Sequence, residues 1–168
     1  EQWRKTPAPF YSSVDLRNAG FKLAPVDTNL FPAGFNNLND RFISLAVQAA
    51  QETLERLLPG CLRILLIPEN HTRNSFYFEN LSTLQDILEK AGFEVRIGSL
   101  LEEMPHAKEI VLASGARITL EPIVRVADQI KVKDFLPCCI LLNNDLANGI
   151  PEILQGIEQT ILPNMNLG

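Results

Sequence analysis

Two clusters of polar side chains each follow directly after a short, continuous run of apolar residues. The run 63–67 ends at Pro68 and is followed by Glu69, Asn70, His71 and Arg73. The run 138–142 is followed by Asn143, Asn144 and Asp145. If the two runs form parallel strands, both clusters lie on one edge of a sheet, where open α/β sheets bind their ligands. The alternative is that these residues only form turns and caps, for which Asn and Asp are well suited.

The chemistry of the first cluster points to a ligand with a carboxylate. Arg73 would stand beside the N-terminus of the next helix, whose free N–H groups and dipole favour an anion. A guanidinium group can also hold a carboxylate through two parallel hydrogen bonds. His71 could serve as a general base, although a single histidine in a loop is more often an ordinary hydrogen-bonding residue.

A third polar cluster lies in the opening segment and contains Arg17, Asp27, Asn29 and Asn36. Asparagine presents a donor and an acceptor together, which suits an amino acid that carries both an ammonium group and a carboxylate. We therefore predict a substrate site built from the three clusters, with Arg17 or Arg73 anchoring the α-carboxylate of an amino acid. The alternative for Asn36 is that it simply precedes a helix.

Several kinds of chemistry find no support in the sequence. The nucleophile motif GxSxG and the phosphate-binding patterns GxGxxG and GxxxxGK[ST] do not occur. We expect no metal site in this chain, because it has no CxxC pair and because His71 and His106 are far apart.

The spacing of apolar residues predicts alternating strands and helices from residue 40 onwards. A helix over 40–57 is expected between an N-cap at Asn39 or Asp40 and the breaker Pro59-Gly60. The continuous apolar run 63–67 is typical of a buried strand. A second helix should bury Leu81, Leu84, Ile87, Leu88 and Ala91 and end at Gly92. The strand 93–97 then completes a β-α-β unit with parallel strands.

The later part of the chain is expected to form short hairpins and one more buried strand. Residues 110–112 pair with 118–120, and residues 123–124 pair with 130–132, as antiparallel hairpins. The strand 138–142 follows, and a last helix is expected from Pro151, a residue that suits the first helical position. Residues 1–39 show no regular pattern and are interpreted as an irregular segment that is packed on the domain and carries a binding motif. The fold class is α/β: a largely parallel sheet flanked by helices, formed by residues 40–168, with an antiparallel hairpin excursion.

Composition excludes some partners. Of 168 residues, 46% are hydrophobic and 21% are charged, as in ordinary globular domains. The net charge of −5 argues against nucleic acid, and no apolar run is long enough to span a membrane. Three cysteines, an odd number, are interpreted as small buried residues of a reducing compartment, so a cytoplasmic location is expected. The chain begins with Glu1 instead of Met, so a removed targeting peptide stays possible.

The same polar clusters carry a resemblance to a known family. Residues 13–38, SVDLRNAGFKLAPVDTNLFPAGFNNL, resemble the N-terminal signature of proteobacterial glutamate–cysteine ligases of the GshA type. Residues 65–74 (LLIPENHTRN), 141–145 and 149–156 are similar to that family as well. The resemblance covers nearly the whole chain, and residue 168 falls well before a protein of this kind would end.

The resemblance implies an ATP-grasp-like ligase that makes γ-glutamylcysteine, the first step of glutathione synthesis. Its substrates would be glutamate, cysteine and ATP, with Mg²⁺ offsetting the phosphate charge. Most contacts to ATP and Mg²⁺ would come from a part outside this chain, which would then be the substrate-side domain. A non-catalytic amino-acid-binding or regulatory domain of the same layout is the alternative, and composition does not separate the two.

Overall fold

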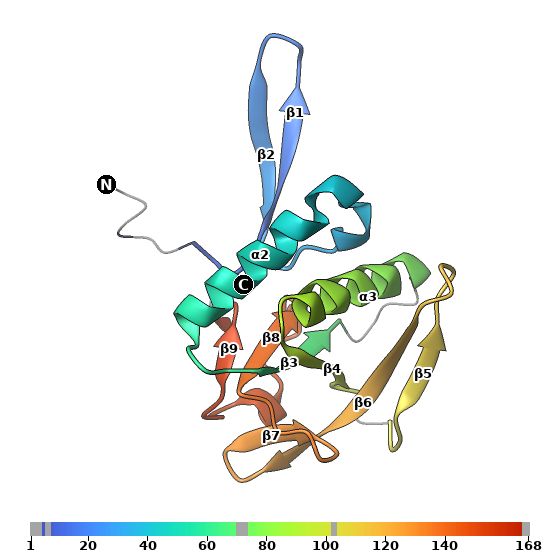
Figure 1. Cartoon of the computed structure of the whole chain (residues 1–168). Coiled ribbons are helices and arrows are strands. Elements are labelled where there is room, and N and C mark those ends of the chain that lie inside the picture. The colour runs from blue at the N-terminus through green and yellow to red at the C-terminus, as the bar shows by residue number, and fades with distance from the viewer. Residues whose placement is uncertain (1–4, 6–7, 70–73, 102–103, 166–168) are drawn as a thin grey trace.

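The computed structural model describes residues 5, 8–69, 74–101 and 104–165 and contains a seven-stranded sheet and a separate two-stranded hairpin (Figure 1). The strand order of the sheet is β5-β6-β4-β3-β8-β9, with β7 paired to β6 off this path. From β6 to β9 all neighbours are parallel, whereas β5 and β7 pair with β6 in antiparallel fashion. The expected fold class, a largely parallel α/β sheet with an antiparallel excursion, is confirmed.

The centre of the sheet consists of three strands that the apolar runs predicted. They are β3 (Arg63–Pro68), β4 (Glu94–Ser99) and β8 (Cys139–Asn143). Ile64 of β3 pairs with Val95 of β4 and with Cys139 of β8, so the three strands run side by side in one direction. Their side chains are almost all buried, as expected for strands that are covered on both faces.

The two faces of the sheet are covered in different ways. Helices α2 (Asp40–Leu57) and α3 (Ser75–Lys90) lie against one face, where Leu54, Leu81 and Leu88 pack on Leu66 and Leu141. Asn39 and Asn74 cap these helices, each accepting a hydrogen bond from the backbone N–H two residues later. The opposite face is covered without a long helix. Its core comprises Phe31, Leu65, Ile67, Ile130, Val132, Phe135, Ile140, Leu142 and Leu154.

The predicted hairpins share one long strand. Strand β6 (Arg117–Val126) pairs with β5 (Lys108–Val111) through its first half and with β7 (Gln129–Val132) through its second half. The middle of β6 also runs parallel to β4. Both hairpins are thus confirmed, and they form one end of the main sheet.

Two expectations about local structure are wrong. Residues 13–29 are not irregular, because β1 (Ser13–Asn18) and β2 (Leu23–Asn29) form an antiparallel hairpin that projects from the body (Figure 1). Its turn is closed by Gly20 at a φ of 86° and by a hydrogen bond from the Gly20 N–H to Asn18 Oδ1. The second wrong expectation is the last helix: Pro151 does not begin one, because only the 3-10 turn η2 (Glu152–Leu154) follows it.

The chain after η2 extends into β9 (Thr160–Leu162), which pairs in parallel with β8. Arg125 explains why no helix forms at this place. Its guanidinium donates hydrogen bonds to the carbonyls of Glu152, Ile153 and Gln155, which a helix would use internally.

The cysteines depart from their expected role. Cys61, after α2, and Cys138, before β8, form a disulfide with their Cα atoms 5.7 Å apart. Cys139 is buried as a free thiol, and burial raises its pKa to about 12. The interpretation as small buried residues therefore holds for Cys139 and is wrong for the other two, so cysteine usage no longer supports a reducing compartment. In the part of the chain that the structure describes, no helix is long and apolar enough to cross a membrane.

Candidate functional site

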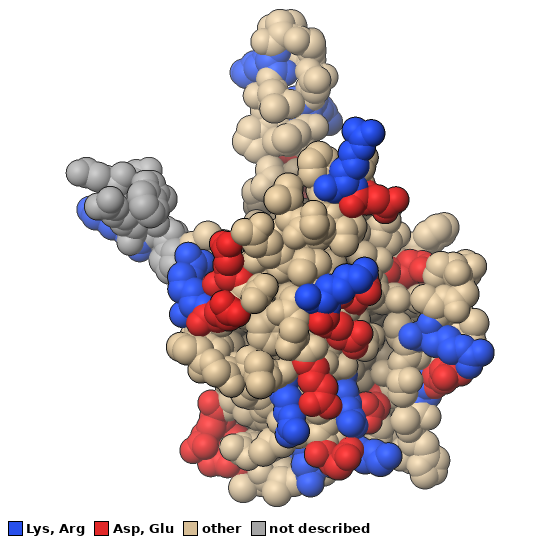
Figure 2. Space-filling model, in the orientation of Figure 1, with Lys and Arg blue, Asp and Glu red and all other residues tan. Residues whose placement is uncertain are grey.

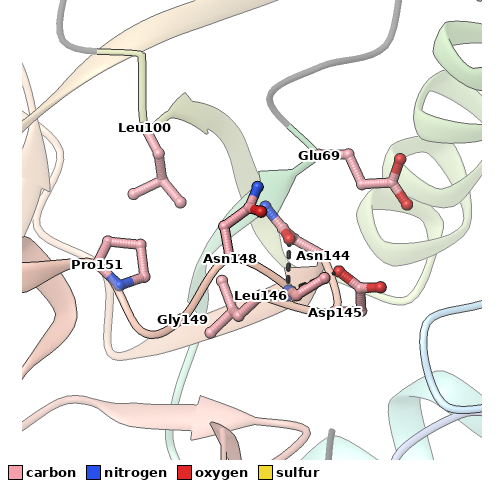
Figure 3. A pocket seen from close by; sticks show the side chains of 9 residues that line it. Glu69, Leu100, Asn144, Asp145, Leu146, Asn148, Gly149 and Pro151 are labelled. Atoms are coloured by element: carbon pink, nitrogen blue, oxygen red, sulfur yellow. Dashed lines mark hydrogen bonds between the residues drawn. The ribbon is translucent and has the colours of Figure 1, made fainter.

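The carboxyl ends of β3 and β8 lie side by side and form one wall of a pocket. Pro68, the last residue of β3, pairs with Asn143, the last residue of β8, so the residues after each strand meet at a common edge. We call this edge the rim. A hollow of about 220 Å³ opens there, lined by Glu69, Leu100, Asn144, Asp145, Leu146, Ala147, Asn148, Gly149 and Pro151 (Figure 3).

The pocket has a polar side and an apolar side. In Figure 3 the carboxylates of Glu69 and Asp145 lie on one side, and Leu100 and Pro151 lie on the other. The pKa of Glu69 is raised, first because the carboxyl is partly desolvated and second because the charge of Asp145 is close. Of the residues that the structure describes, the lining includes these two acids and no Lys or Arg. Such a pocket favours a cationic group, such as the ammonium of an amino acid, over a phosphate.

Glu69 also lines two neighbouring hollows. One, of about 330 Å³, brings it together with Asn36, Asn37, Asn74 and Tyr77. Another, of about 490 Å³, lies between the ends of β3 and β4 and the strand β5, and Lys108 is among its lining residues. Glu69 therefore lines three hollows at this edge of the sheet.

A buried hydrogen-bond network holds the backbone of the rim. The hydroxyl of Tyr77 in α3 accepts a hydrogen bond from the N–H of Glu69 at 2.9 Å. The same hydroxyl donates to Asn143, whose carbonyl oxygen is 2.8 Å away and whose Oδ1 is 3.0 Å away. Burial raises the pKa of Tyr77, so this hydroxyl stays protonated and able to donate. Tyr77 thus fixes the ends of both central strands at once.

The segment before α2 is tied into this network. Asn143 Nδ2 donates to the carbonyl of Pro32 at 2.9 Å, and the hydroxyl of Tyr11 donates to the carbonyl of Leu142. Asn80 in α3 accepts from the N–H of Phe35 at 3.0 Å and donates to Asn143 Oδ1 at 3.4 Å. The rim is therefore built from four segments that are distant in the sequence.

The predicted site residues of the second cluster divide into two roles. Asn143 is 1% exposed and lies behind the pocket, where its side chain makes only internal hydrogen bonds among those described. Asn144 lines the pocket while its Nδ2 donates to the carbonyl of Pro68 at 3.2 Å, which joins β8 to β3. Asp145 lines the pocket directly and accepts a hydrogen bond from the N–H of Ala147. Asn144 and Asp145 are thus placed for ligand contact, and Asn143 supports them.

The remaining predicted residues are found in three places. Asn36 lines a hollow beside the rim pocket together with Glu69. Arg17 and Asp27 lie on the projecting hairpin and do not line the rim pocket, while Asn29, at its base, accepts a hydrogen bond from the N–H of Phe31. Asn70, His71 and Arg73 lie outside the described residues, so their roles stay predictions.

Sequence reasoning missed Tyr77, and it named Glu69 only as a member of the first polar cluster and not among the substrate-binding residues. Glu69 follows a buried strand directly, and that position is a signal which could have singled it out from its polar neighbours. Tyr77 had no such signal, because only the folded chain shows that its hydroxyl meets two strand ends. Among the described residues, no group of three or more His, Cys, Asp or Glu side chains could hold a metal ion.

The fold and the rim define a class, namely an open and largely parallel α/β sheet with a polar pocket at the carboxyl ends of its central strands. Within that class the chain belongs to the GshA family of glutamate-cysteine ligases, whose family model matches residues 1–168. This finding confirms the resemblance that the sequence motifs carried.

A solved structure supports both the family and the fold. It is a protein from Methylobacillus flagellatus KT that is described as a candidate gamma-glutamylcysteine synthetase. The two chains are 56% identical, and their structures agree with a TM-score of 0.91. The match covers 96% of this chain but only 38% of the other, so the chain spans well under half the length of that protein. A search of curated proteins found no match.

Proposed function

We propose that this chain is the substrate-side part of an ATP-dependent ligase that joins glutamate to cysteine. The observation that carries the proposal is the match of all 168 residues to the GshA glutamate-cysteine ligase family. In the proposed reaction the side-chain carboxylate of glutamate takes the γ-phosphoryl group of ATP. The amine of cysteine then attacks the acyl phosphate, and phosphate leaves as γ-glutamylcysteine forms. This reaction would be the first step of glutathione synthesis.

The rim pocket would bind the amino-acid end of a substrate in this proposal. Glu69 and Asp145 supply negative charge for an ammonium group, and the amides of Asn144 and Asn148 supply both donors and acceptors. Asn36 would approach from the neighbouring hollow that it shares with Glu69. A carboxylate of the same substrate would be bound by Arg73, which comes just before helix α3 in the sequence.

The described residues do not fit the phosphates of ATP or their Mg²⁺. Among the described residues, the pocket lining has two carboxylates and no cation, so these residues would repel a triphosphate. The described part of the chain also has no cluster of three or more metal-ligating side chains. We therefore place ATP and Mg²⁺ on a part of the ligase outside this chain.

Titration of the 168-residue chain with glutamate, cysteine and ATP with Mg²⁺, followed by NMR, tests the proposal. We expect glutamate or cysteine to shift the backbone signals of Glu69 and Asp145, and we expect no ADP release. Glu69→Gln should weaken amino-acid binding about tenfold, because a charge-assisted hydrogen bond is lost.

Glu94→Gln is the matched control for that titration. It makes the same change of charge at the start of β4, the end of the strand opposite the rim, and should leave binding unchanged. If neither amino acid binds, the proposal that this chain binds the amino-acid substrates is wrong. Binding of an amino acid without any turnover in the longer Methylobacillus protein would favour the regulatory alternative.

A further inference from the structure

The projecting hairpin has one apolar and one polar face. Pairing places Val14 opposite Thr28, Leu16 opposite Pro25, and Asn18 opposite Leu23, and paired residues share a face. The other face holds Asp15 opposite Asp27 and Arg17 opposite Ala24. We call the surface formed by Val14, Leu16, Leu23 and Pro25 the apolar face of the hairpin.

This face has no cover among the described residues. Val14, Leu16 and Leu23 are 46%, 57% and 60% exposed, and Phe21 at the tip is 91% exposed. Strands β1 and β2 pair only with each other in the described part of the chain. Much of the visible hairpin surface in Figure 2 is uncharged, whereas acidic and basic side chains are spread over the body below it.

An uncovered apolar hairpin is unusual for physical reasons. A two-stranded hairpin is at best marginally stable in water, and it needs a third strand or another packed element to persist. Contiguous exposed apolar surface on a soluble protein marks an interaction site. Helix α2, which follows the hairpin in the chain, adds a second uncovered strip with Phe42 at 56% and Leu45 at 58% exposed.

We propose that the apolar face of the hairpin docks on a part of a longer ligase chain that lies outside these 168 residues. The Methylobacillus protein contains the fold of this chain as 38% of its length, so most of that protein is available to cover the hairpin. An apolar face without charges resembles half of a domain core, as is typical of permanent interfaces. The proposal rests on family membership and not on the chemistry of the rim, so its test does not use activity.

Hydrogen exchange of the 168-residue chain and of the full Methylobacillus protein provides the test. We expect the hairpin amides of residues 14–28 to exchange at nearly the unprotected rate in the 168-residue chain. The matching segment of the longer protein should exchange at least about 100-fold more slowly, because covered strands open only with their surroundings. Fast exchange in both proteins overturns the proposal.

Slow exchange of these amides in the 168-residue chain also overturns the proposal. A measurement of the molar mass of that chain in solution then identifies what covers the hairpin. A dimer that Leu16→Asp dissociates would show that a second copy is the partner. A monomer would show that the hairpin is stable alone.

A chimera supplies a matched pair of variants. The 168 residues replace the matching portion of the Methylobacillus protein, and Leu16→Asp on the apolar face is compared with Arg17→Asp on the polar face. We expect Leu16→Asp to lower the Tm of the chimera by at least about 3 °C and to leave that of the 168-residue chain unchanged. Arg17→Asp should change neither, and equal losses for the two variants would contradict a docked apolar face. The exchange comparison decides the question by itself if the chimera does not fold.

Discussion

The hairpin and the rim are both surfaces where predicted binding residues lie, but they are supported in opposite ways. The rim rests on buried strands, and its backbone is held by Tyr77, Asn80 and Asn143 inside the core. The hairpin is held, among the described residues, by its own two-stranded ladder and the turn at Gly20. The geometry of the rim is therefore a property of this chain, whereas the geometry of the hairpin depends on what covers it. A binding role for Arg17 or Asp27 would accordingly require that the hairpin is docked on the rest of a longer ligase chain, as we propose.

The largest expected contrast between the two regions comes from one substitution made in each. Leu141→Ala in β8 removes a fully buried side chain and should lower the free energy of unfolding by about 2–5 kcal/mol. Leu16→Ala in β1 should change it by less than about 0.5 kcal/mol, because that side chain is mostly exposed. Urea unfolding of the 168-residue chain measures both. A loss of more than about 1 kcal/mol for Leu16→Ala would mean that the hairpin is supported from within this chain.

A medium effect is expected from removing the hydroxyl that joins the strand ends. Tyr77→Phe leaves the N–H of Glu69 and an oxygen of Asn143 without this partner, at a cost of roughly 1–3 kcal/mol. Thr28→Val removes an exposed hydroxyl from the hairpin and should cost less than about 0.5 kcal/mol. The same unfolding measurement compares the two variants. Equal stabilities for Tyr77→Phe and the unchanged chain would show that the network does not brace the rim.

The smallest effect concerns the charge of the rim. The pKa of Glu69 is raised above its ordinary value of 4.5, so ionisation of this group disfavours the folded state. Its stabilising contribution is present below pH 4.5 and is lost as the pH rises through the raised pKa. Glu69→Gln should therefore raise the free energy of unfolding at pH 7 by roughly 0.5 kcal/mol or less, because the residue is exposed, and so raise the Tm slightly. No gain is expected at pH 4.

Asp145→Asn tests the second cause of that shift. It removes the neighbouring charge that contributes to the raised pKa of Glu69, so the gain from Glu69→Gln should shrink in its presence. Thermal unfolding of the two single variants and the double variant at pH 4 and pH 7 measures the coupling. If Asp145→Asn does not change the stability gain from Glu69→Gln at pH 7, desolvation alone raises the pKa of Glu69.

The core elements were predictable because local signals and tertiary structure agree. The run 63–67 is apolar on both faces, and α2 begins and ends where Asn39 and Pro59-Gly60 indicate. The hairpin escaped prediction because Pro25 lacks an N–H and normally argues against a strand. It is tolerated here beside a bulge, where the register shifts between Asp15 and Leu16. The expected helix at Pro151 failed because pairing with β8 and the hydrogen bonds of Arg125 outweigh a local preference.

The position of the rim pocket was predictable from the sequence, but the arrangement of its side chains was not. Two strands that end in polar clusters correctly indicated a common edge with Asn144 and Asp145. Which asparagine faces the pocket depends on how deeply each one is buried, and no local pattern shows that Asn143 lies behind Asn144. Likewise, only the assembled chain creates the three hollows that Glu69 lines.

The hydrogen bonds of Asn143 have a consequence for how the protein is made. Its contacts with Pro32 and Tyr77 span 111 and 66 residues, and Tyr11 reaches Leu142 across 131 residues. A ribosome adds residues one at a time, so the early segment with Tyr11 and Pro32 must wait until β8 has left the exit tunnel. Contacts of such long sequence separation form late and slow the folding of a domain. The binding edge is thus completed only near the end of synthesis of these residues, and a nascent chain that stops before Asn143 lacks it.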